Sequence, residues 1–148
     1  MTPALRRDVL RASGLPAVCS VSVDLNHTIV WCSDKRKSAG FLAEMLGRPE
    51  PKAFHHFLVV ELDNGVSLDF LEKAGRIAAQ HYAFLISEAE FDAVFARLGQ
   101  RGLDYWADPA KRQPGEINRH DGGRGVYFED PDGHLLEVIT RPYGSGGD

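Results

Sequence analysis

Four residues of metal-binding types lie in segments that are otherwise built from apolar residues. His27 and His81 each open a run of apolar, β-branched and aromatic residues, which predicts a strand. Asp69 and Glu137 each interrupt an apolar run of the same kind. A carboxylate in such a strand is costly to bury unless it is paired or binds a metal ion. Two imidazoles with one or two carboxylates suit Fe(II), Mn, Ni, Zn or Co.

These residues occupy equivalent places in an internal repeat. Segments 27–34 and 81–88 both begin with His, continue with mainly apolar residues and end in Ser and an acid, 54 residues apart. A second spacing of 68 residues relates Gly65 to Gly133, and each glycine precedes one of the two acids by four positions. A twofold relation between the halves would bring all four side chains toward one centre. The prediction is a metal site of His27, His81 and Glu137, with Asp69 as a candidate fourth ligand.

Each residue taken alone has a structural alternative. A single histidine on a half-buried strand is more often a hydrogen-bonded polar group than a ligand. In that interpretation Glu137 is an edge-strand acid bonded to Arg141 or to solvent, and Asp69 serves the turn at Asn64 or faces water. The metal site is favoured because a histidine and an acid recur at equivalent positions in both halves.

A helix and further strands follow each histidine segment in the same order. Ser33 or Asp34 can cap the first helix, and Ser87 opens a capping box before a second helix that stops at Gly99 and Gly102. Strands are predicted at 54–62 and 66–71 in the first half and at 103–107, 125–129 and 134–140 in the second, with an irregular, Pro- and Gly-rich loop at 108–123.

The two halves are expected to form a single domain. Each is too small to bury a complete core alone, so they should pack side by side and combine their sheets. The predicted fold class is α+β, with modules at about 25–75 and 79–142 of one domain that spans 25–142. Residues 1–24 are predicted to form a flexible leader and residues 143–148 a flexible tail.

Composition excludes several classes of protein. The 148 residues include 17 Lys and Arg against 21 Asp and Glu, a formal net charge of −4, whereas general nucleic-acid binders and membrane-surface proteins are basic. We expect no nucleic-acid partner, no membrane and a small-molecule substrate. Cys19 and Cys32 are the only cysteines and form no CxxC pair, which excludes a disulfide framework and favours a reducing, cytoplasmic setting.

The sequence resembles the vicinal oxygen chelate superfamily, which includes glyoxalases, bleomycin-resistance-type binding proteins, fosfomycin-resistance thiol transferases and extradiol dioxygenases. Segments 25–27 and 81–84 carry the resemblance, and the most specific motif is 125–137, GVYFEDPDGHLLE. The resemblance covers 25–142 and implies two βαβββ modules that form a cupped, barrel-like mixed sheet around one divalent metal ion. It also implies a homodimer. The family's ligands map to His27, His81 and Glu137, and glyoxalase I-like members add an acid that maps to Asp69.

The resemblance implies a metal-dependent isomerase, lyase or dioxygenase whose substrate binds the metal through two adjacent oxygens. Asp69 or Glu137 is the candidate base. The candidate pocket residues are Tyr127, Tyr82, Trp106 and Arg119. The alternative is a bleomycin-resistance-type protein that sequesters an aromatic or peptide-like compound, but the retained ligands favour the enzyme. A glutathione-binding set of the glyoxalase I kind is not identified, and the fosfomycin transferases, which segment 80–84 resembles, lack an acid at the place of Asp69.

Overall fold

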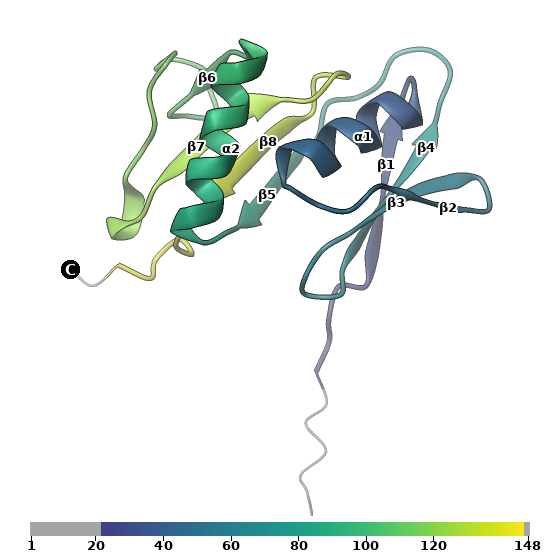
Figure 1. Cartoon of the computed structure of the whole chain (residues 1–148), viewed down its shortest axis with the longest axis horizontal. Coiled ribbons are helices and arrows are strands. Elements are labelled where there is room, and N and C mark those ends of the chain that lie inside the picture. The colour runs from purple at the N-terminus through teal and green to yellow at the C-terminus, as the bar shows by residue number, and fades with distance from the viewer. Residues whose placement is uncertain (1–21, 147–148) are drawn as a thin grey trace, which may run out of the picture.

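The computed structural model describes residues 22–146 as two modules that each combine one helix with a four-stranded sheet (Figure 1). This confirms the predicted α+β class with two similar modules. Residues 1–21 of the predicted leader and residues 147–148 of the predicted tail lie outside the described residues. No helix among residues 22–146 is long and apolar enough to cross a lipid bilayer.

The modules have the same topology. The first contains β1 (His27–Cys32), α1 (Lys35–Met45), β2 (Lys52–Phe54), β3 (Phe57–Glu61) and β4 (Ser67–Glu72). The second contains β5 (His81–Leu85), α2 (Glu88–Arg101), β6 (Tyr105–Trp106), the short 3-10 helix η1 (His120–Gly122), β7 (Gly125–Glu129) and β8 (Leu135–Ile139). The sheet orders are β1-β4-β3-β2 and β5-β8-β7-β6, and in each sheet the first strand runs parallel to its neighbour.

Strand register confirms the internal repeat. Ile29 on β1 lies opposite Asp69 on β4, and Ala83 on β5 lies opposite Glu137 on β8. These two pairs are related by the same spacings of 54 and 68 residues that relate the histidines and the acids. The first and last strands of each module are therefore neighbours, and each histidine lies near the acid of its own module.

The helix ends follow the capping chemistry in the sequence. The Asp34 carboxylate accepts the backbone N–H groups of Arg36 and Lys37 and caps α1. Ser87 caps α2 in the predicted capping box, in which the Glu90 carboxylate accepts the backbone N–H of Ser87 at 2.8 Å. Helix α2 continues past Gly99 and ends at Gly102, whose φ of 60° is a left-handed conformation that glycine adopts without steric cost.

Two strand predictions need correction. The segment predicted as one strand at 54–62 is a hairpin, because His55 has a φ of 50° and turns the chain between β2 and β3. His55 and His56 are therefore both exposed in this turn. The strand predicted at 103–107 is reduced to β6, because Ala107 already hydrogen-bonds into the following loop through Gln113.

One apolar core joins the modules on the helix side of the sheets. Both helices lie on the same side of the two sheets (Figure 1). Side chains of α1, including Phe41, pack with side chains of both sheets, and the Phe41 and Phe128 ring centroids are 6.4 Å apart. Arg97 on α2 donates to the backbone carbonyl of Met45 at the end of α1. Within residues 22–146 the buried apolar side chains of both modules form one cluster.

The β7–β8 turn fastens the second module to the first. His134 is 1% exposed; its Nε2–H donates to the carbonyl of Trp31 at 2.8 Å and its Nδ1 accepts the backbone N–H of Gln80 at 2.9 Å. The Asp132 carboxylate accepts the N–H of Ser33 and the hydroxyl of Ser38, both at 3.0 Å. These contacts fix the start of α1 against the second module.

Candidate metal centre

The candidate ligands lie on the sheet faces that turn away from the helices. Along β1, Val30 and Cys32 are buried in the core, whereas His27, Ile29 and Trp31 are exposed. Because side chains alternate between the faces of a strand, His27 lies on the open face of its sheet. The same alternation on β5 buries Phe84 and leaves His81, Ala83 and Leu85 on the open face.

His81 and Glu137 form a close pair in the second module. Their Nε2 and Oε2 atoms are 3.0 Å apart, and the side chains are 46% and 2% exposed, respectively. His81 Nδ1 lies 3.1 Å from the carbonyl oxygen of Leu135, and Nε2 faces the carboxylate of Glu137, so both ring nitrogens lie within hydrogen-bond distance of an acceptor. While Nδ1–H donates to Leu135, Nε2 is the nitrogen that either donates its own hydrogen to Glu137 or, without that hydrogen, binds a metal ion.

Two tyrosines complete the surroundings of Glu137. The hydroxyl of Tyr143 donates to Glu137 Oε1, and the Tyr127 hydroxyl lies 2.9 Å from the Tyr143 hydroxyl. The Tyr127 ring stacks on His81 with centroids 5.9 Å apart. Burial, the hydrogen bond to Tyr143 and the nearby Glu137 carboxylate raise the pKa of Tyr127 far above its ordinary value. Burial and the Glu137 carboxylate raise the pKa of Tyr143 as well, so both hydroxyls keep their protons at neutral pH.

His27 and Asp69 share an open hollow in the first module. The hollow has a volume of about 510 Å³, and its apolar walls include Ile29, Phe54 and Val59. Asp69 is half-buried, and its carboxylate accepts the hydroxyl of Ser67 at 2.8 Å. His27 is exposed, and its Nδ1 lies 2.8 Å from the side-chain oxygen of Asn26, which leaves Nε2 available.

The chain brings the four candidate ligands together as two pairs. Among residues 22–146, no group of three or more His, Cys, Asp or Glu side chains is placed to hold a metal ion. His27 and Asp69 line one hollow, whereas His81 borders a different one, of about 510 Å³, between the modules. Each pair thus forms half of the predicted constellation.

The donor chemistry of the second pair fits a transition-metal ion. An ion that binds two ligands at right angles with bonds of about 2.1 Å holds the donor atoms about 3.0 Å apart, which is the separation of His81 Nε2 and Glu137 Oε2. The buried carboxylate and the Nδ1-bonded imidazole are the groups that such an ion requires. Two donors from one chain still leave most coordination positions to other groups.

The predicted pocket residues divide between the two faces of the second sheet. Tyr127 lies opposite Glu137 in the β7–β8 pairing, and Trp106 lies opposite Tyr127 in the β6–β7 pairing, so these residues share the Glu137 face. Tyr82 points to the core side, where its ring meets the edge of His134. Arg119 is exposed in the loop before η1.

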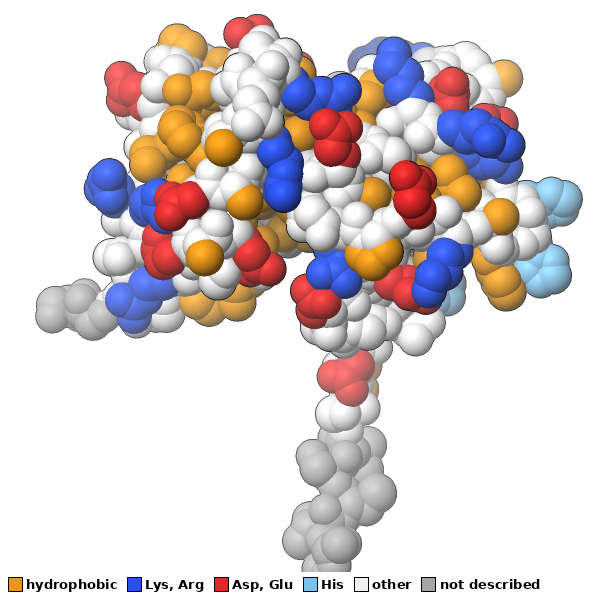
Figure 2. Space-filling view, viewed as in Figure 1, with side chains coloured by type: hydrophobic (Ala, Val, Ile, Leu, Met, Phe, Trp, Pro, Cys, Tyr) orange, Lys and Arg blue, Asp and Glu red, His pale blue; other side chains and the backbone are white. Residues whose placement is uncertain are grey.

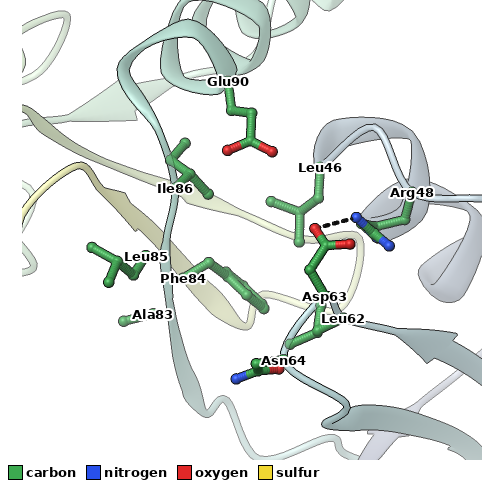
Figure 3. Close-up of a pocket in the computed structure, with 10 residues that line it drawn as sticks. All are labelled: Leu46, Arg48, Leu62, Asp63, Asn64, Ala83, Phe84, Leu85, Ile86 and Glu90. Atoms are coloured by element: carbon green, nitrogen blue, oxygen red, sulfur yellow. Dashed lines mark hydrogen bonds and ion pairs between the residues drawn. The ribbon is translucent and has the colours of Figure 1, made fainter.

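Figure 3 shows a second hollow at the junction of the modules, with a volume of about 300 Å³. Leu46, Phe84 and Ile86 give it apolar walls. Its charged groups already have partners, because Arg48 is paired with Asp63 at 2.6 Å and Glu90 belongs to the α2 capping box. The candidate metal ligands therefore lie on the open sheet faces and not in this hollow.

Sequence reasoning missed Tyr143, which lies in the segment predicted as a tail. The residue type and its place six positions after Glu137 give no periodic signal, because the chain leaves β8 at Ile139 and turns back. Only the path of residues 140–146 brings the phenol to the carboxylate.

Comparisons with known proteins agree with the two-module fold. Residues 24–138 match the profile described as the Glyoxalase/Bleomycin resistance protein/Dioxygenase superfamily. The solved structure of Oxidase ChaP-H2 is 59% identical, covers 86% of this chain and 100% of its own, and has a TM-score of 0.84. Oxidase ChaP-H1 is also 59% identical, covers 83% of this chain and 99% of its own, and has a TM-score of 0.82.

Curated relatives are more distant. The glutathione transferase FosA of Serratia marcescens is 32% identical over 77% of this chain and 78% of its own length. The metallothiol transferase FosB of Shouchella clausii is 40% identical over 49% of this chain, a match that spans only 45% of that relative.

Proposed function

Because the chain belongs to the glyoxalase/bleomycin resistance protein/dioxygenase superfamily, we propose that it is a divalent-metal-dependent oxidase. Its substrate is a small molecule that binds the metal ion through adjacent oxygens. The observation that carries this proposal is the pair of His81 and the buried Glu137, with donor atoms 3.0 Å apart. The similarity to two oxidases at 59% identity favours oxidation over isomerisation. Two histidines and one carboxylate are typical of iron(II) enzymes that use oxygen.

We propose further that the complete site forms between two copies of the chain, from His27 and Asp69 of one protomer and His81 and Glu137 of its partner. Each pair lies on an open sheet face that also exposes large apolar side chains. The exposed fractions are 42% for Trp31, 59% for Phe54 and 60% for Leu85. By contrast, acidic and basic side chains are interspersed over the helix side (Figure 2). Apolar surface of this kind is typical of an interface.

The chain's own residues have distinct roles in this proposal. The bound metal ion would act as a Lewis acid that stabilises negative charge on the substrate oxygens and, as iron(II), would react with oxygen. His81 and Glu137 hold the ion, and the carbonyl of Leu135 orients the imidazole. Asp69, half-buried in the apolar hollow beside His27, can bind the ion or take a proton from the substrate. Tyr127 and Trp106 form a wall of the site on the second sheet.

A mixed dimer tests this arrangement. His27→Ala and His81→Ala chains, co-expressed with two different tags that do not bind metal, are purified as the heterodimer, and iron and other transition metals are measured per chain. A site shared between protomers leaves one of the two sites of a symmetric dimer intact. We therefore expect about half of the wild-type metal content in the heterodimer and none in either homodimer.

Two outcomes would contradict the proposal. A metal-free heterodimer would mean that the ligands belong to one chain, and a wild-type protein without metal would favour the binding protein that sequesters its ligand. His55→Ala is the matched control, because His55 is exposed at the β2–β3 turn. Its metal content should equal that of the wild type.

A further inference from the structure

The C-terminal segment reaches from the surface to the buried carboxylate of Glu137. Tyr143 is 55% exposed, yet its hydroxyl donates to Glu137 Oε1. The Glu137 side chain is 2% exposed, and His81 bonds its other oxygen. A surface residue outside the two sheets thus supplies one of the two hydrogen bonds of the buried acid.

Asp121 holds this segment in place. Its two carboxylate oxygens accept the backbone N–H groups of Gly144 at 3.1 Å and Gly146 at 3.0 Å. Gly146 lies so close that an added Cβ would be 2.7 Å from the Cα of Asp121. These contacts hold residues 144–146, directly after Tyr143, against η1.

The backbone at Asp121 is itself unusual. Its φ of 55° and ψ of 24° are left-handed, in a residue that is not glycine. Such a conformation costs free energy and persists where surrounding contacts determine it, although aspartate tolerates it better than most residues. In this turn the conformation accompanies the double hydrogen bond to the segment.

We propose that residues 142–146 form a strap anchored by Asp121, and that Tyr143 on this strap is a positioning residue that fixes the orientation of Glu137. The terminal torsion of a glutamate is soft, so a carboxylate held at one oxygen only can rotate. The phenol holds Oε1 and thereby directs Oε2 toward His81 Nε2. The role of Tyr143 in metal binding rests on the proposed function, whereas its hold on Glu137 does not.

Metal affinity is the first test. Apo protein is titrated with Co²⁺, and the dissociation constant and the absorption spectrum of the bound ion are recorded for each variant. Groups that orient metal ligands typically change affinity by 10- to 100-fold, so Tyr143→Phe should weaken Co²⁺ binding about 10-fold and alter the spectrum. Asp121→Ala should also weaken Co²⁺ binding.

A double variant separates the strap from a general structural effect. If Asp121 acts through Tyr143, the combination of Asp121→Ala and Tyr143→Phe weakens Co²⁺ binding no more than Tyr143→Phe alone. Full additivity of the two effects would overturn the strap. Tyr105→Phe is the matched control. It removes a phenol hydroxyl from β6, in the sheet that contains Glu137, where the Tyr105 ring packs on Phe95 of α2. It should bind Co²⁺ as the wild type does.

Hydrogen exchange of metal-free protein keeps this inference distinguishable from the proposed function. Amides of residues 143–146 should exchange faster in Tyr143→Phe and in Asp121→Ala than in the wild type or Tyr105→Phe. Equal exchange in all four proteins would overturn the strap, whatever the metal result. If Co²⁺ binds the wild type and Tyr143→Phe equally, the positioning role is wrong while the proposed metal site stands. If the wild type binds no Co²⁺, the proposed function fails, and exchange alone decides whether Tyr143 holds Glu137.

Discussion

The two modules place their histidine and acid at equivalent register positions but in different surroundings. In the second module, Glu137 is buried and hydrogen-bonded at both oxygens, by His81 and by Tyr143. In the first module, His27 is exposed and Asp69 bonds its own neighbour, Ser67. The duplicated fold has kept the positions of the four residues and changed what holds them.

This difference indicates a division of roles. A ligand set that is already oriented loses little conformational entropy when the ion binds, so the second module should contribute most of the affinity. The first module combines its pair with a hollow of about 510 Å³ and apolar walls. That hollow has room for a substrate beside the ion, so the first module should contribute most of the specificity.

The acids give the strongest test of this division. Glu137→Gln keeps the volume of the side chain and removes its charge, and we expect the dissociation constant for Co²⁺ to rise by more than about 100-fold. Asp69→Asn, the matched change in the first module, should raise it about 10-fold or less. Isothermal titration of the apo proteins measures both. Equal losses of Co²⁺ affinity in the two variants would show that both pairs contribute equally to binding, and would contradict the proposed division of roles.

The junction between the modules is equally asymmetric. His134 joins Gln80 to Trp31, whereas the residue at its repeat-equivalent position, Val66, has an apolar side chain. His134→Ala removes a fully buried side chain and leaves a partly buried N–H and a partly buried carbonyl without their partner, which should lower the free energy of unfolding by about 2–4 kcal/mol. Urea unfolding at neutral pH measures this change.

Val66→Ala is the control for the junction. Removing two methyl groups from a half-buried side chain should cost about 1 kcal/mol or less. If His134→Ala costs no more than Val66→Ala, the turn does not fasten the modules.

Local pattern determined what the sequence could predict. The cap of α2 and the alternation of faces along β5 and β8 follow from residues within a few positions of each other. The repeat follows from two segments that match at a fixed spacing. The turn at His55 was not predicted because a histidine in an apolar segment does not indicate a positive φ. The approach of Tyr143 to Glu137 was missed because it depends on the path of a loop after β8. The separation of the two pairs depends on how the modules pack, which no local pattern encodes.

The ends of the first strands differ in chemistry. Cys32 at the end of β1 corresponds to Ile86 after β5 and is fully buried. Burial, followed by the nearby charges of Asp132 and Glu72, raises the pKa of the Cys32 thiol from 9.0 to about 11. In the range from pH 9 to 11 the unfolded chain has lost this proton and the folded chain keeps it, so stability should fall as pH rises.

The pH dependence is measured against a variant without the thiol. Between pH 9 and 11 the free energy of unfolding should fall more steeply in a Cys19→Ser protein than in the Cys19→Ser, Cys32→Ala protein. The first protein should also resist a thiol reagent at pH 8 until it is unfolded. Parallel pH profiles, or rapid labelling of the folded protein, would contradict the burial of Cys32.

The helix caps provide the smallest expected effects and show how far the repeat extends. Ser33 and Ser87 are repeat-equivalent, but α2 is capped by Ser87 and α1 by the next residue, Asp34. We expect Asp34→Ala and Ser87→Ala each to lower the free energy of unfolding by about 1 kcal/mol. Ser33→Ala keeps the backbone N–H that Asp132 accepts and should change it by less than about 0.5 kcal/mol. A loss at Ser33 equal to that at Ser87 would mean that the caps follow the repeat.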